Sequence, residues 1–238
     1  MSGYRLTADT QARAKRGLAV LAALLVLAAL VAAFVVAPTE REMGDVQRIF
    51  YFHVASAWTA FLAFFVVFIG SVAYLRTRAL RWDTLAASAA EIGIVFTSLT
   101  LISGSVWARS AWGTWWTWEP RLTTTLMLWL IYVSYLLLRG MMEDADRRAA
   151  FAAVFGIIGF VDVPIVFLSI RWWRTLHPQV VGSEGFNMET TMLAVMFLSI
   201  IAFTVVFVHV LLLRTGLERS QQELVELRRR AGWIQGGG

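Results

Sequence analysis

The sequence predicts an all-α integral membrane protein with six membrane-spanning helices, and two observations predict this fold class. First, 58% of the 238 residues are hydrophobic and the mean hydropathy is +0.66, which is too apolar for a soluble domain of this size. Second, the apolar residues fall in long blocks, and a helix needs about 20 such residues to cross the hydrocarbon core. Lipid offers no partners for backbone groups, so the spanning segments should be helical.

Six apolar segments have the required length, and short loops join them into a single polytopic domain over residues 1–238. The first segment resembles a signal peptide, but its apolar run is longer than the usual core of about 7–15 residues, and we interpret it as a retained anchor. A charged cytoplasmic tail is expected at residues 214–238. The expected spans are about 18–37, 55–75, 86–106, 121–139, 150–170 and 190–213.

Basic residues predict the orientation. With the N-terminus inside, the cytoplasmic segments carry 15 of the 21 Arg and Lys residues. The positive-inside rule therefore places both termini in the cytoplasm. The net charge of +5 follows from this topology and gives little reason to expect a nucleic acid partner. The outer loops carry the remaining six basic residues, which are Arg41, Arg48, Arg109, Arg121, Arg171 and Arg174.

The chain contains no cysteine, which excludes disulfides, thiolate-bound iron–sulfur clusters and covalent attachment of a c-type haem through this chain. Metal ligands would have to be His, Met or oxygen donors. No Walker motif, nucleophile elbow or HExxH motif is present, so the chain alone should not hydrolyse ATP and we expect no enzyme activity.

Tryptophan is concentrated in two outer loops. A plain aromatic belt would occupy both membrane surfaces, whereas the inner side has only Trp82 and Trp233. If residues 112–118 form an amphipathic helix on the periplasmic surface, three indoles share one face and offer a platform for a planar ligand. A belt alone is the alternative. The platform would consist of Trp112, Trp115 and Trp116, with Trp118 to one side.

Two histidines fall on the same predicted face as these tryptophans. His53 stands at the start of the second span and His177 just after the fifth. Either one alone is more often an interfacial polar residue than a ligand, but imidazole is a common ligand of haem iron. Two imidazoles would fill both axial positions of a non-covalent haem b, which suits carrying haem better than activating oxygen.

Arginines near the platform are candidates for the haem propionates, because a guanidinium binds a carboxylate with two parallel hydrogen bonds. The candidates are Arg109, Arg121, Arg171 and Arg174. A solvated loop charge is the alternative for each. Two acids and one histidine lie inside predicted spans, where such groups are costly. Among these, Glu91 and Asp162 have open roles, and His209 is expected to be structural because it is near the cytoplasmic side.

The stretch WGTWWTWEPRLTT, residues 112–124, resembles the tryptophan-rich signature of a family of haem-handling membrane proteins. The segments QRIFYFHVASAW and VPIVFLSIRWWRTLH are similar to the two histidine segments of its CcmC members, which are haem-export subunits of the cytochrome c maturation system. The resemblance covers about residues 40–215. The chain departs from the pattern at Glu119, where Asp is usual, and at Ala55, where Pro is frequent; without that proline the second helix can begin earlier.

The resemblance implies a protein of the bacterial inner membrane that holds haem at the outer leaflet with His53 and His177. It implies that a periplasmic haem chaperone, CcmE, docks there and becomes covalently bonded to a haem vinyl group through its own histidine. It also implies an ATP-binding-cassette pair, CcmA and CcmB, whose ATP hydrolysis releases the loaded chaperone, and a small membrane subunit, CcmD.

Two other functions fit parts of the pattern. An electron-transfer b-type cytochrome or quinone-linked anchor typically grips haem between helices inside the bilayer, whereas both outer histidines are expected at loop–helix boundaries. A small-molecule transporter often has inverted repeats or helices broken near the midplane. The sequence has no repeat and only Pro164 as a candidate helix breaker within the spans.

Overall fold

The computed structural model describes residues 2–178, 181–182, 185–186 and 188–231. These residues are mostly helical, with one two-residue antiparallel hairpin in which Val181 pairs with Phe186 and Gly182 with Gly185. The elements are α1 (Ser2–Val31), the π-helical turn η1 (Ala32–Val36), the 3₁₀ turn η2 (Asp45–Arg48), α2 (Ile49–Thr77), α3 (Leu80–Trp112), α4 (Pro120–Gly140), α5 (Ala145–Phe160), α6 (Asp162–Trp172), β1 (Val181–Gly182), β2 (Gly185–Phe186) and α7 (Thr190–Arg230).

Six helical segments of the described chain are long and apolar enough to cross a membrane, which confirms the all-α, six-span class. They exceed the expected spans because hydropathy marks only the apolar part of a helix. The 33 residues of α3, for example, measure about 50 Å, against a hydrocarbon core of about 30 Å. The segments are Ala12–Val36, Asp45–Thr77, Leu80–Trp112, Pro120–Gly140, Ala145–Trp172 and Thr190–Arg228.

The fifth span consists of two helices. α5 ends at Phe160 and α6 begins at Asp162, with a turn at Val161 between them. Pro164 explains the interruption, because its nitrogen cannot donate the hydrogen bond to the preceding turn. The sixth span continues without a break into the charged tail as far as Arg230; residues 232–238 of the expected tail lie outside the described residues.

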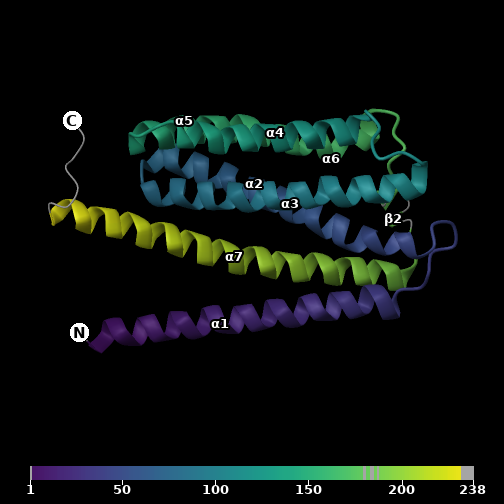
Figure 1. The fold of residues 1–238 in the computed structure, drawn as a ribbon, viewed down its shortest axis with the longest axis horizontal. Helices are drawn as coiled ribbons and strands as arrows, with labels where there is room; N and C mark the ends of the chain where they lie inside the picture. Colours follow the sequence, from purple (N-terminus) through teal and green to yellow (C-terminus); the bar gives the residue numbers. More distant parts are fainter. Residues whose placement is uncertain (1, 179–180, 183–184, 187, 232–238) are drawn as a thin grey trace.

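The helices pack in layers, as Figure 1 shows. α2 and α3 form a central pair, with α4, α5 and α6 on one side and α7, covered by α1, on the other. The central pair packs closely because small residues line it. A Cβ atom at Gly93 would lie 2.5 Å from Cε1 of Phe64, and the Phe64 ring stacks on Tyr132 with 3.7 Å between ring centres. Small residues at such contacts are typical of membrane helix bundles.

The two ends of the bundle differ. The start of α1 and the end of α7 lie at one end, which we call the termini end (Figure 1). η2, the segment 113–119 and the loop after α6 lie at the opposite end, which we call the histidine end. The three sequence features singled out above therefore meet at one end of the molecule.

Candidate haem site

His53 lies on α2, at the fifth residue of the helix. The sequence placed it at the entrance of a span starting near residue 55, but α2 begins at Ile49. The histidine is therefore part of a regular helix instead of a loop–helix boundary. Ala55 is fully buried in the same helix and does not interrupt it, as expected from the absence of proline at this position.

The neighbours of His53 determine which ring nitrogen carries the proton. His53 Nδ1 lies 3.0 Å from Oγ of Ser103 on α3. The Ser103 hydroxyl donates its single hydrogen to the carbonyl of Leu99 at 2.6 Å, so its oxygen accepts from His53. The proton is then on Nδ1, and Nε2 keeps the lone pair with which a neutral imidazole binds a metal.

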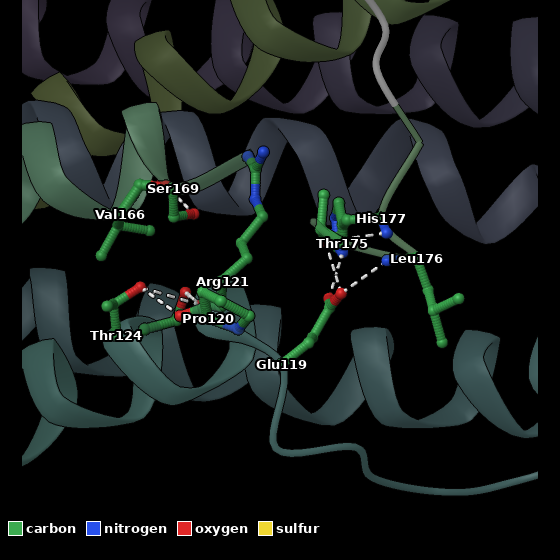
Figure 2. Close-up of polar contacts among 10 residues, drawn as sticks. Glu119, Pro120, Arg121, Thr124, Val166, Ser169, Thr175, Leu176 and His177 are labelled. Carbon is green, nitrogen blue, oxygen red and sulfur yellow. Dashed lines mark hydrogen bonds and ion pairs between the residues drawn. The ribbon is translucent and has the colours of Figure 1, made fainter. Parts of the chain in front are cut away.

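His177 is held by a carboxylate from another part of the chain. Its Nδ1 lies 3.3 Å from Oε1 of Glu119, the residue that precedes α4. Oε2 of Glu119 accepts hydrogen bonds from the Leu176 amide at 2.9 Å and from the Thr175 hydroxyl. Figure 2 shows the carboxylate directed at these three residues. Glu119 thus ties the loop after α6 to the start of α4.

Charge and burial favour one protonation state for this pair. Burial would raise the pKa of the Glu119 carboxyl, but hydrogen bonds from His177, Thr175 and Leu176 outweigh it and hold the pKa below its ordinary value. Burial also lowers the pKa of His177, although its hydrogen bond to Glu119 acts in the opposite direction. At neutral pH the imidazole is neutral and donates from Nδ1, which again leaves Nε2 free to bind a metal.

The fold brings the two histidines together although they are far apart in sequence. Their ring centres are 6.3 Å apart and their planes differ by 39°. Trp107 and Trp112, at the end of α3, lie beside His177 with ring centres 6.5 Å and 6.1 Å from it. The two indoles meet edge to face, with 5.2 Å between their centres.

A cavity of about 400 Å³ opens at this pair. α2, α3, α4, α6 and α7 contribute its mostly apolar walls, and its size lies within the range of small-molecule sites, about 300–1,000 Å³. The residues with aromatic, cationic or ligating side chains that line it include His53, His177, Trp107, Trp112, Trp116, Arg121 and Arg171.

The prediction that residues 112–118 form an amphipathic helix is wrong. α3 continues through Trp112 and ends at Gly113, whose φ of +75° is the left-handed conformation that glycine adopts readily. Residues 114–119 have no helical structure, so the indoles do not share a helix face. Trp112 and Trp116 line the cavity. Trp115 and Trp118 instead are 59% and 75% exposed.

The arginines divide in a similar way. Arg121 and Arg171 line the cavity, whereas Arg109 and Arg174 do not. Arg109 donates to the carbonyl of Gly113 instead. Arg121 makes no side-chain hydrogen bond or ion pair with any residue that the structure describes, and Figure 2 shows its guanidinium directed away from α4.

Three residues of this site were not among the predicted site residues. Glu119 and Ser103 orient the histidines, and Trp107 lines the cavity. Glu119 directly precedes Pro120, which occupies the first turn of α4, but the Glu119 side chain makes no cap hydrogen bond. The position of Glu119 next to the tryptophans in the sequence could have marked it as a site residue. Nothing in the sequence around Ser103 indicates such a role.

Comparison with known proteins matches the chain to one family and to relatives that carry its name. The model of one family, described as CcmC, "Heme exporter protein C", matches residues 5–235. A protein of that name from Bradyrhizobium diazoefficiens is 34% identical over 195 residues, covering 80% of this chain and 74% of its own. Those from Haemophilus influenzae and Escherichia coli are 31% and 38% identical, covering 79% and 59% of this chain and 77% and 58% of their own lengths.

Proposed function

Because the chain belongs to the haem exporter protein C family, we propose that it binds haem b without a covalent bond and presents it to the periplasmic chaperone CcmE. CcmE then attaches the haem covalently during cytochrome c maturation. In this proposal the chain is a haem-transfer subunit without catalytic activity, and His53 and His177 are the two axial ligands.

The observation that carries this proposal is the arrangement of the two imidazoles. Each has its Nδ1 engaged, by Ser103 or Glu119, which leaves both Nε2 atoms available. If these two imidazoles held one metal ion between them, their ring centres would be about 6 Å apart, because a metal–imidazole distance is about 2.0 Å and each ring centre would lie about 1 Å further back. The observed 6.3 Å agrees with this separation.

The lining of the cavity suits the rest of a haem molecule. Trp107, Trp112 and Trp116 offer flat apolar surfaces for the porphyrin. Arg121 and Arg171 place guanidinium groups at the cavity, where the propionates need cationic partners. When bound, haem supplies an iron whose two axial positions these histidines would fill, which favours storage and transfer over oxygen chemistry.

We propose that the histidine end faces the periplasm and that both termini are in the cytoplasm of a bacterium, with the chain in the inner membrane. The biased distribution of arginine and lysine supports this orientation. The exposed indoles of Trp115 and Trp118 then lie at the periplasmic end, next to the cavity-lining Trp116, and form the edge at which CcmE docks.

The remaining partners follow from the family proposal. CcmA and CcmB would form the ATP-hydrolysing pair and CcmD a small membrane subunit of the same complex. Membrane lipid covers the apolar outer helix faces, of which exposed Leu24 and Leu27 of α1 are examples. No nucleic acid is expected as a partner.

Absorption spectra of the purified protein, oxidised and reduced, test the proposal. The wild type supplied with haem should show a six-coordinate, low-spin spectrum, which His53→Ala and His177→Ala should each lose. His209→Ala is the matched control, because this histidine lies on α7 and does not line the cavity. A low-spin spectrum unchanged in both site variants, or lost in the control, would refute the ligand assignment.

A further inference from the structure

A second cavity, of about 310 Å³, lies at the termini end, opposite the histidine pair. It is formed where the end of α4 and the start of α5 approach α3 and the charged part of α7. In contrast to the haem site its walls carry many charges. The charged or amide side chains that line it are Glu91, Arg139, Arg148, Arg214, Glu218 and Gln222.

Two of the three arginines are already paired. Arg139 binds Asp83 through both terminal nitrogens. Arg214 binds Glu91 through Nε at 2.6 Å and Nη2 at 2.8 Å, and binds Glu218 through Nη1 at 2.9 Å. Arg214 therefore faces two carboxylates, and this group of three carries a net negative charge.

The third arginine is not paired. Arg148 makes no side-chain hydrogen bond or ion pair with the residues that the structure describes, and its Nε is buried. The residue as a whole is half-buried, but an Nε donor that neither solvent nor a described residue satisfies is costly, which points to an anionic acceptor in the cavity. On the acidic side, Oε1 of Glu218 accepts no hydrogen bond from the described residues, so it can receive a cationic donor.

The cavity thus offers a free cation and a free carboxylate oxygen within one small volume, near the membrane surface that the span boundaries define. Pockets between membrane helices that present a basic side chain near the membrane surface can bind the phosphate of a lipid headgroup. We propose that this cavity binds the headgroup of an aminophospholipid, with its phosphate on Arg148 and its primary ammonium on Glu218. A group with a phosphate and an ammonium matches both unsatisfied partners, whereas a purely anionic group leaves Glu218 unused.

Native mass spectrometry of the full-length protein in detergent tests this site with defined lipids. Phosphatidylethanolamine should bind about tenfold more tightly than phosphatidylcholine, because the two share the phosphate but only the first has ammonium N–H donors. Arg148→Gln should weaken both lipids by about tenfold. Glu218→Gln should remove the preference between them. Arg147→Gln is the matched control, since it removes the same charge from the neighbouring, exposed residue.

Equal binding of the two lipids by the wild type, or equal behaviour of the Arg148 and Arg147 variants, would overturn the proposal. Circular dichroism and gel filtration confirm that each variant is folded. The source of the group is tested with soluble O-phosphoethanolamine. O-phosphoethanolamine is the better ligand if it raises the melting temperature of the wild type but not of Arg148→Gln, while phosphatidylethanolamine raises neither. In that case the cavity binds the same phosphate and ammonium groups, but from a soluble molecule instead of a lipid. None of these measurements depends on haem.

Discussion

Nδ1 of His177 lies 3.3 Å from Oε1 of Glu119, a residue 58 positions earlier in the chain. A carboxylate in this position fixes the imidazole tautomer and makes Nε2 a stronger electron donor to a bound metal. His53 has the neutral Ser103 hydroxyl in the same position. The two proposed ligands therefore differ in basicity, and His177 should be the more strongly donating of the two.

Replacement of Glu119 tests this role. Glu119→Gln keeps an oxygen that can accept from Nδ1 but removes the negative charge. We expect haem affinity to fall by about 10–100-fold, as for outer-shell changes at other metal sites, and the haem reduction potential to rise because His177 donates less. Haem titration and a redox titration, both followed by absorption, measure the two effects.

Glu42→Gln is the control for that experiment, since Glu42 is an exposed carboxylate in the loop before η2 at the same end of the bundle. Glu119 also holds the loop after α6 through Thr175 and Leu176. A fall in affinity without a change in potential would mean that Glu119 acts only by holding this loop, and the electronic role would be wrong.

The haem-free protein should become less stable as the pH falls below 6.5. The pKa of His177 is lowered in the folded state, so the unfolded chain takes up a proton first, and stability is lost from the ordinary histidine pKa of 6.5 downward. The pKa of Glu119 is also lowered in the folded state, so its protonation causes a second loss of stability below the ordinary pKa of 4.5. Melting temperatures at pH 7.5, 6.5 and 5.5 should fall more in the wild type than in His177→Gln; identical slopes would contradict this.

The sequence predicted the membrane part of the fold well because hydrophobic length is a local property. The prediction of a helix at the tryptophan segment, residues 112–118, was wrong, and the reason is also local. The spacing of Trp112, Trp115 and Trp116 fits a helix, but Gly113 ends α3 between the first and second of them. The spacing of apolar residues does not show where a helix ends. A glycine within the spaced residues has to be considered as a possible helix end.

The partners of the site residues could not be predicted, since they come from distant parts of the chain. Arg171 and Arg174 are three residues apart, and only the end of α6 at Trp172 separates the one that lines the cavity from the one that does not. Likewise, the open role of Glu91 became clear only when α7 brought Arg214 to it, 123 positions later. Asp162 keeps a buried Oδ2 atom without a hydrogen-bond partner, and nothing in the structure explains it.

Gly104 leaves room for the imidazole of His53. A Cβ atom at this position would lie 2.9 Å from His53 Cε1, which is closer than carbon atoms can approach. Gly104→Ala should therefore displace the ring and weaken haem binding by about tenfold, with partial loss of the low-spin spectrum. Gly17→Ala is a suitable control, because that helical glycine has nothing within 4 Å of the added atom. Unchanged spectra in Gly104→Ala would show that His53 has other space to occupy.

The tryptophans should separate haem binding from haem transfer. Trp116→Ala removes an indole that lines the cavity, and we expect a loss of about 1 kcal/mol in haem binding. Trp118→Ala removes an indole that is 75% exposed, so haem binding should be unchanged while transfer to CcmE is slower. Haem titration and a transfer assay with purified CcmE distinguish the two variants. Reduced haem binding in Trp118→Ala would mean that this indole moves into the cavity when haem is bound.

Arg121 should bind a haem propionate, because its guanidinium lines the cavity and has no hydrogen-bond or ion-pair partner among the described residues. Arg121→Gln should weaken haem binding by about 1.5–3 kcal/mol, the usual contribution of a hydrogen bond to a charged group. Arg174→Gln, which removes an exposed arginine of the loop after α6, should have no effect. Titration with haem and with its dimethyl ester, which lacks the propionate charges, identifies the contact. The wild type should prefer haem over the ester and Arg121→Gln should not; if both proteins show the same preference, the propionates are bound elsewhere.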